Sequence, residues 1–190
     1  MANKIKYGLE KVYYAKVTSV STAGTLSYGT PSAWPGAVSL NMSQQSGSNN
    51  FYADNVIYFK TEANNGYEGT LETALIPDDF RKDILGEVLD AKGFYVEKSN
   101  ATASEFALMF QFEGDENATR HIFYRCVASR PDVAGSTKEE NIEPQTETIN
   151  LSALPRIDEK VVKARAPYSS ASTSSYQKWY ETVQEPTVTP

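Results

Sequence analysis

The feature that most constrains this chain is the recurrence of short stretches in which apolar and polar residues alternate between Gly, Asn and Pro breaks. Such alternation places apolar side chains on one face of a strand, and the abundant Tyr, Phe, Val and Thr favour strands. The sequence therefore predicts a mainly β protein, a β-sandwich or barrel of about eight strands. The expected strands are Lys11–Thr18, Ala37–Gln45, Asn55–Ala63, Tyr67–Ile76, Gly93–Lys98, Glu105–Glu113, Thr119–Ser129 and Thr146–Ala166, the last with a break near Pro155.

The length and net charge of the chain limit the classes of protein to which it can belong. The 190 residues suffice for one domain with a sizeable core. The formal net charge of -6 disfavours general affinity for nucleic acid or for an anionic membrane. The first residues lack the apolar region of a signal peptide, and no run is long enough to span a bilayer. The sequence thus predicts a soluble protein made in a cytoplasm, without membrane insertion.

One short flanking helix is expected from Asp78 to Leu85. Asp78 and Asp79 are acids of the kind that favour a helix N-terminus, and Gly86 is placed to cap the C-terminus. Three apolar residues share one face of this helix: Phe80, Ile84 and Leu85. The helix is therefore expected to pack on the domain's own sheet.

The most apolar part of the chain is the hairpin expected around a turn at 113–117. One side of its first strand carries Phe106, Leu108, Phe110 and Phe112. The second strand is expected to match them with Ile122, Tyr124 and Cys126. This hairpin therefore predicts a core face.

Catalytic chemistry is not expected. Cys126 is the only cysteine, which excludes an internal disulfide and a thiolate metal cluster, and an apolar strand position is its simplest interpretation. His121 is the only histidine, and no nucleophile elbow, metal-ligand pair or Gly-rich phosphate loop accompanies it. A histidine on a strand surface or facing a lumen is expected. The sequence predicts a protein that is not an enzyme and has no cofactor or metal.

A turn at 64–66 is expected to fold Val56–Ile76 into a hairpin. A three-residue loop with Gly66 in the left-handed conformation places the following residues opposite one another: Phe59 and Leu71, Ile57 and Thr73, Glu62 and Glu68. A two-residue loop would instead pair Lys60 with Leu71 and mix apolar with polar side chains on both faces. We therefore favour the first register.

This register places three carboxylates on one side of the hairpin, Glu62, Glu68 and Glu72, with only Lys60 to offset them. Like charges that face each other across strands are unfavourable, by about 0.2 to 1 kcal/mol per pair. In an isolated domain the arrangement is a small liability that selection need not remove.

Two segments are expected to reach beyond the core. The segment 19–36 is rich in turn residues and reads as an extended loop, whose Trp34 is expected at a subunit contact together with an N-terminal arm. The segment 168–190 is Ser/Thr-rich but carries Tyr176, Trp179, Tyr180 and Val183 at helical spacing, so it either closes onto the domain or docks on a neighbouring subunit. The expected organisation is a domain over 1–167 and a C-terminal arm over 168–190.

Several of these stretches together resemble one family. They are F-Y-A-D-N at 51–55, G-Y-E-G-T-L-E at 66–72, I-P-D-D-F at 76–80, I-L-G at 84–86 and G-F-Y-V at 93–96. In this order, over roughly residues 5–166, the chain resembles the major tail proteins, or tail tube proteins, of long-tailed bacteriophages, particularly those of Gram-positive hosts. The fold is also similar to inner-tube proteins of contractile tails and related injection machines.

The resemblance implies a structural virion protein. Its subunits would form hexameric rings that stack into the tail tube, with strands of all six subunits lining a conduit for double-stranded DNA. The implied partners are further copies of the chain, other tail proteins such as tape measure, tail tip and terminator, and DNA that passes without sticking. Inside such a tube, Glu62, Glu68, Glu72 and Lys60 are candidates to face the lumen, where an acidic wall would not trap phosphates. The alternative is that the tip of this hairpin projects along the tube axis and contacts the next ring. Candidates for contacts between subunits are Trp34, Tyr28, Trp179 and Tyr180.

A binding module is the alternative from another class. A β-sandwich could present aromatic side chains to carbohydrate or to a receptor, and the candidates are Tyr13, Tyr14, Tyr28 and Trp34. Such a module stays monomeric, whereas a tube protein forms rings or rods.

Overall fold

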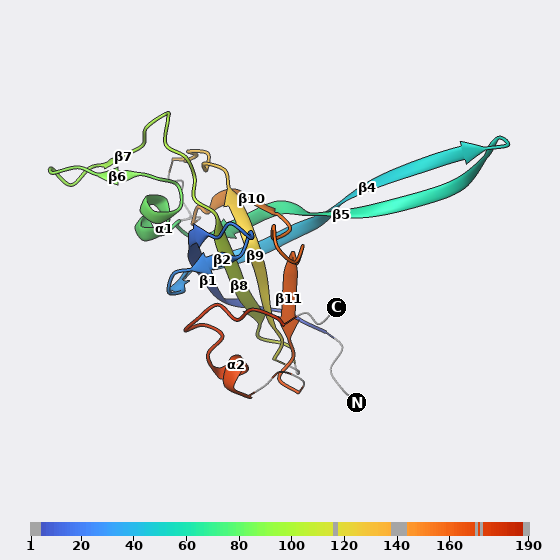
Figure 1. Cartoon of the computed structure of the whole chain (residues 1–190). Coiled ribbons are helices and arrows are strands. Elements are labelled where there is room, and N and C mark those ends of the chain that lie inside the picture. The colour runs from blue at the N-terminus through green and yellow to red at the C-terminus, as the bar shows by residue number, and fades with distance from the viewer. Residues whose placement is uncertain (1–4, 116–117, 138–143, 170, 172, 188–190) are drawn as a thin grey trace.

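The computed structural model describes residues 5–115, 118–137, 144–169, 171 and 173–187 (Figure 1). The strands are β1 (Leu9–Val20), β2 (Leu26–Tyr28), β3 (Ser32–Ala33), β4 (Ala37–Ala53), β5 (Val56–Thr73), β6 (Val88–Leu89), β7 (Tyr95–Val96), β8 (Phe106–Phe112), β9 (Arg120–Ala128), β10 (Glu147–Ala153) and β11 (Lys163–Ala166). The helices are α1 (Asp78–Asp83) and α2 (Thr173–Gln177). Neither of these helices is long or apolar enough to cross a membrane.

One antiparallel sheet dominates the molecule, with the strand order β2-β1-β8-β9-β10-β5-β4. β3 adds to β1 and β11 adds to β9, while β6 and β7 form a separate hairpin. The mainly β prediction is confirmed. The described strands do not close into a barrel, because β2 and β4 lie at opposite ends of the order. The predicted break near Pro155 is confirmed by the separation of β10 from β11.

The sheet is buried on both faces where β8 crosses it. Phe106, Leu108 and Phe110 belong to the larger apolar cluster, and Ala107 and Met109 to a second cluster on the opposite face. A strand covered on both sides reads as a continuous apolar run, as the sequence of β8 does. The predicted core face of β8 is therefore correct.

The predicted pairing of β8 residues with β9 residues is correct only in part. Cys126 is opposite Phe106 and fully buried, but Leu108 is opposite Phe123. The register shift between these two pairs adds one residue to β9, which reverses the side on which the following residues lie. Ile122 and Tyr124 therefore lie in the second cluster, on the other face.

Helix α1 covers the larger cluster, as expected. Asp78 and Asp79 occupy its first turn, and Gly86 follows with a φ of 78°. Phe80 and Ile84 have no exposed surface. The Phe80 ring packs edge-on against Tyr14 and Phe106, at centroid distances of 5.0 and 5.2 Å. The predicted packing of this helix on its own sheet is confirmed.

The segment 19–36 corrects one prediction. It contains β2 and β3, and β3 pairs with β1 and leads Trp34 into the core. The indole is 2% exposed, its nitrogen donates a hydrogen bond to Oγ1 of Thr73 at 3.1 Å, and its ring lies 4.3 Å from Phe80. A buried indole with its N–H satisfied has no surface left for a second chain. The prediction of Trp34 as a contact between subunits is therefore wrong.

The C-terminal segment closes onto its own domain. Trp179 is 4% exposed and lies in the second cluster with Met109 and Tyr124. The Tyr180 hydroxyl donates to Oε1 of Gln111 at 3.0 Å. Of the two alternatives for this segment, the described residues 173–187 thus adopt the first.

The hairpin expected at 64–66 is wrong. β5 runs without interruption from Val56 to Thr73, and its partner on one side is β4 over the whole length. The chain turns instead at Asp54 and Asn55. Consequently Glu62 lies opposite Ser48 rather than opposite Glu68.

Candidate assembly surface

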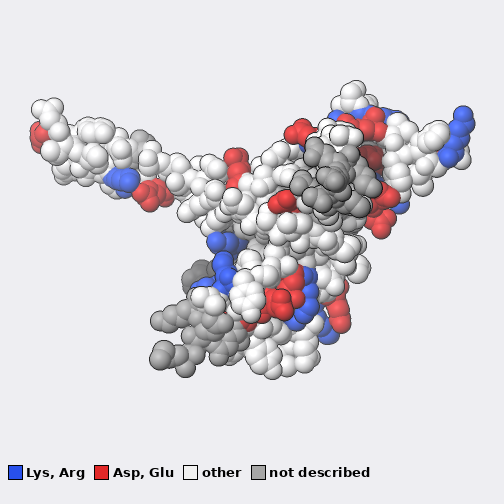
Figure 2. Space-filling view, turned by 180° about the vertical axis from the view of Figure 1, so that it is seen from behind, with Lys and Arg blue, Asp and Glu red and all other residues white. Residues whose placement is uncertain are grey.

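The most unusual feature of the molecule is an arm formed by the distal halves of β4 and β5. β10 pairs with β5 only from Tyr67 to Thr73, so over 46–65 each strand of the arm has only the other as a partner in the described chain. At about 3.3 Å per residue the arm extends roughly 30 Å. Figure 1 shows it projecting away from the body, and Figure 2 shows a largely uncharged surface along it.

The tip of the arm is a two-residue turn. Asp54 and Asn55 have φ angles of 52° and 62°. Two successive residues of positive φ are typical of a type I′ turn, whose twist matches that of the flanking strands, and Asp and Asn tolerate this conformation. The turn therefore fixes the register in which Ala53 faces Val56.

Close backbone contacts define the base of the arm. Gly66 has a φ of 110°, and a Cβ atom there would lie 2.1 Å from the Ala153 carbonyl oxygen of β10. A Cβ at Gly69 would lie 1.7 Å from the Asn41 carbonyl oxygen of β4. Only glycine fits at these two positions. The residues Asn64-Asn65-Gly66 thus mark where β5 leaves the sheet, rather than a turn.

Large apolar side chains cover the end of the arm. Those with more than half of their surface exposed are Phe51, Tyr52, Val56, Ile57, Tyr58 and Phe59. Soluble monomers seldom expose a contiguous apolar patch of this kind unless it binds something. The outer edges of β4 and β5 beside it have no strand partner among the described residues, and such edges present backbone N–H and C=O groups that are a template for another strand.

The predicted lumen candidates do not share one face of the arm. Glu68 is opposite Ser43, and Glu62 is opposite Ser48. The register shift between these pairs places the extra residue on β5, so β4 is regular over the six residues from Ser43 to Ser48 and its side chains alternate. Glu62 and Glu68 therefore lie on opposite faces, contrary to the expected row of three carboxylates.

The three carboxylates that were predicted to face a lumen lie in different environments. Glu68 and Glu72 lie on the same face, and Glu68 is exposed. Hydrogen bonds from Thr146 and Ser39, at 2.7 and 3.0 Å, lower the pKa of Glu72. A hydrogen bond from Lys60, with an N–O distance of 2.7 Å, lowers the pKa of Glu62.

A second, shorter hairpin is also apolar and exposed. β6 and β7 pair through Val88 with Val96 and Leu89 with Tyr95. All four side chains are more than a third exposed, as is Phe94 beside them. Figure 1 shows this hairpin on the opposite side of the body from the arm. The two projections thus give the subunit apolar surfaces that face in different directions.

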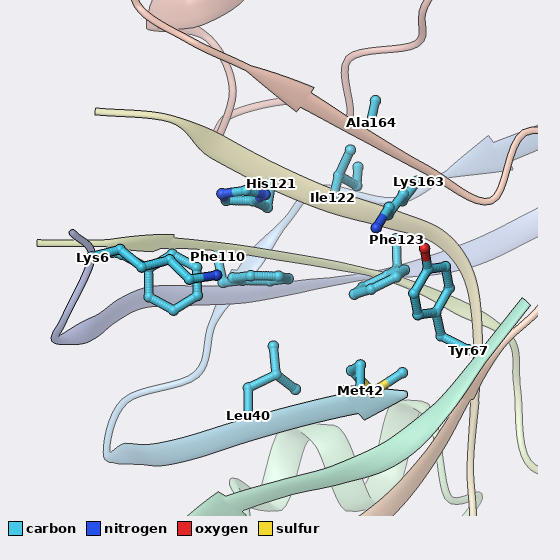
Figure 3. A pocket seen from close by; sticks show the side chains of 11 residues that line it. Lys6, Leu40, Met42, Tyr67, Phe110, His121, Ile122, Phe123, Lys163 and Ala164 are labelled. Atoms are coloured by element: carbon cyan, nitrogen blue, oxygen red, sulfur yellow. The ribbon is translucent and has the colours of Figure 1, made fainter. Parts of the chain in front are cut away.

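A groove opens beside the base of the arm, with a volume of about 220 Å³. Leu40 and Met42 of β4 line one side, and β8 and β9 supply Phe110 and His121 opposite them (Figure 3). The His121 ring stacks on Phe110 at a centroid distance of 5.2 Å. Burial, with a smaller effect from Lys6, lowers the pKa of His121 to about 4. His121 is therefore neutral at pH 7.

The other predicted aromatic candidates are engaged within the chain. The Tyr28 hydroxyl donates to the Tyr124 carbonyl oxygen at 3.1 Å. Tyr14 is 2% exposed, and the Tyr13 ring lies 4.7 Å from that of Tyr180. With Trp34 also buried, the four aromatics proposed for a binding module do not form an exposed platform.

No family model matches the sequence, and a search of curated proteins found no match.

Proposed function

We propose that this chain is a structural virion protein whose copies assemble into stacked hexameric rings and form the tail tube of a long-tailed bacteriophage. The proposal combines the sequence resemblance with one structural observation, the apolar β4–β5 arm whose outer edges are unpaired in the described chain. An isolated two-stranded hairpin is marginally stable in water. Pairing with strands of neighbouring copies satisfies its backbone and buries its apolar side chains.

The geometry of the arm suits a ring. An arm that projects from one side of the body contacts a different surface on the next copy, which makes a head-to-tail interface. Such interfaces generate rings when the rotation closes. A ring of arms joined edge to edge supplies the continuous β wall of a tube, with a β-sandwich-like body outside it.

Charge on the arm and at its base supports a conduit for DNA. Glu68 and Glu72 lie on one face of its base, and Lys60 and Glu62 form an ion pair that adds no net charge. A wall rich in Lys and Arg would bind the duplex through counterion release. Glu68 and Glu72 on the lumen side keep the duplex sliding through a hydrated gap.

The alternatives differ in what they require. An inner-tube protein of a contractile tail-like injection machine uses the same ring assembly in another particle. A carbohydrate- or receptor-binding module needs exposed aromatics, whereas Tyr14 and Trp34 are buried. The arm therefore favours assembly over the binding module.

Electron microscopy with an arm-deleted variant tests the proposal. We expect the intact chain at raised concentration to form rings or rods in negative stain. A variant in which an Asn-Gly turn replaces residues 46–65 should keep the thermal unfolding midpoint of the body but stay monomeric, because none of the deleted residues belongs to either of the two apolar clusters of the described chain. Monomers of the intact chain at every concentration and salt, with and without a tail-tip template, would overturn the proposal.

A further inference from the structure

Two cations in the groove lack an anionic partner in the described chain. The Lys6 ammonium lies 4.6 Å from the centroid of the Phe112 ring, and the Lys163 ammonium lies 4.3 Å from that of Tyr67. Neither forms an ion pair with a described carboxylate, and Figure 3 shows Lys6 beside Phe110 and Lys163 beside Phe123. The groove therefore presents an apolar floor between two positive charges, which suits an apolar occupant that carries an acid.

The tip of the arm has the complementary character. Asp54 in the turn makes no ion pair with a described cation, whereas Glu62 further along the arm is paired with Lys60. Next to Asp54 lie apolar side chains, of which Ile57 is 53% and Tyr58 is 73% exposed. The tip is thus an apolar wedge with one free carboxylate.

A chain does not fill its own groove. Met42 lines the groove, and Asp54 follows it by twelve positions along an extended strand, about 40 Å at 3.3 Å per residue. Figure 1 shows that this strand leads away from the body. Within one chain, the wedge and the groove therefore remain apart, and the occupant has to come from outside.

We propose that the tip of the β4–β5 arm of one copy docks in the groove of a second copy. Asp54 then lies between Lys6 and Lys163, and the apolar side chains beside the turn contact Phe110 and Phe123. One contact thus buries the exposed apolar side chains of the tip and pairs charges that are otherwise unpaired in the described chain. The inference rests on the proposed self-assembly, and it specifies the surface of the neighbouring copy that the tip of each arm contacts.

Site-directed cross-linking tests the contact directly. Tagged copies with Asn55→Cys and untagged copies with Ala164→Cys, which keep Asp54 and Lys163 in place, are mixed and treated with a short bismaleimide. Cys126 has no exposed surface, so each copy presents one reactive thiol. We expect a covalent heterodimer, and a matched control with Lys82→Cys, an exposed lysine on α1, should give none. No heterodimer from the first pair under conditions of assembly would overturn the docking.

Charge reversal supplies a second measurement. Asp54→Lys or Lys163→Glu alone should raise the protein concentration needed for assembly by roughly tenfold, since like charges then meet in the groove. The double variant should restore most of the loss, and Lys82→Glu should change nothing. An unchanged assembly concentration in both single variants would contradict the docking.

The failure of this inference is distinguishable from failure of the proposed function. Rods that form without a cross-link between positions 55 and 164 would overturn the docking but not the proposed tube. Cross-linked copies that never form rings or rods would support the docking and overturn the tube.

Discussion

At the scale of single residues, the aromatic cluster under α1 gives a direct test of the core. Phe80 has no exposed surface and contacts Tyr14, Trp34 and Phe106. We expect Phe80→Ala to lower the free energy of unfolding by roughly 3 to 5 kcal/mol, through lost transfer energy and the cavity left behind. Denaturant unfolding of the monomer measures the change. Phe59→Ala on the arm, 59% exposed, is the control and should be nearly neutral; equal losses would contradict the assignment of Phe80 to the core.

His121 should make stability depend on pH. Its pKa is about 4 in the folded chain, against 6.5 as the ordinary value, because burial disfavours the charged ring. As the pH falls from 6.5 to 4, the unfolded chain takes up a proton that the folded chain does not, so stability is lost. His121→Phe should reduce the loss over this window by up to about 3 kcal/mol. The measurement is the free energy of unfolding at pH 7 and pH 4; identical pH dependences would show that burial does not perturb His121.

At the scale of elements, the base of the arm depends on Gly66. An alanine Cβ would meet the Ala153 carbonyl oxygen, and the positive φ disfavours any side chain. We expect Gly66→Ala to cost about 1 to 3 kcal/mol in the free energy of unfolding. Gly135→Ala is the control, because nothing lies within 4 Å of a Cβ at that position. A neutral Gly66→Ala would mean that β5 bends elsewhere.

The elements show what the sequence alone can predict. The helix near Asp78 and the core strand β8 follow from local signals: acids at the N-terminus, a glycine after the last turn and a continuous apolar run. The arm was missed because Asn64-Asn65-Gly66 is a stronger turn signal than Asp54-Asn55. The signal that identifies the arm is the pair Asp54-Asn55 between two apolar runs, 51–53 and 56–59. The pairing of residues 67–73 of β5 with β10 favours a turn at Asp54-Asn55 over one at Asn64-Asn65-Gly66. Because β10 lies far along the chain, this contact cannot be read from the local sequence.

Burial of Trp34 was not predictable for a related reason. The segment 19–36 reads as an irregular loop because its strands β2 and β3 are only three and two residues long. Their positions depend on β1, and the indole finds its partner Thr73 at the far end of β5. Contacts between residues distant in the sequence leave no periodic trace in it.

At the scale of the whole molecule, the proposed tube predicts a role for charge. We expect particles with Glu68→Lys and Glu72→Lys together to form tubes but to deliver less DNA, with part of the loss relieved at high salt, because added cations bind phosphates. DNA delivery into host cells is the measurement. Particles with Glu159→Lys and Glu181→Lys, two exposed residues outside the arm, undergo the same change in charge and should deliver normally. Normal delivery by the first variant would contradict a lumen position for these carboxylates.

The pairing of β1 with β8 has a consequence for the order in which the chain folds. Leu9 lies opposite Phe112, so the body cannot close until more than half of the chain has been synthesised, and sheets built on such distant contacts form slowly. The β4–β5 hairpin is local, and hairpins form within about 1 to 10 microseconds. On the ribosome the arm therefore emerges before the body can close, and its apolar tip stays exposed in the meantime. A chaperone that shields residues 51–59 should accordingly raise the yield of the native chain.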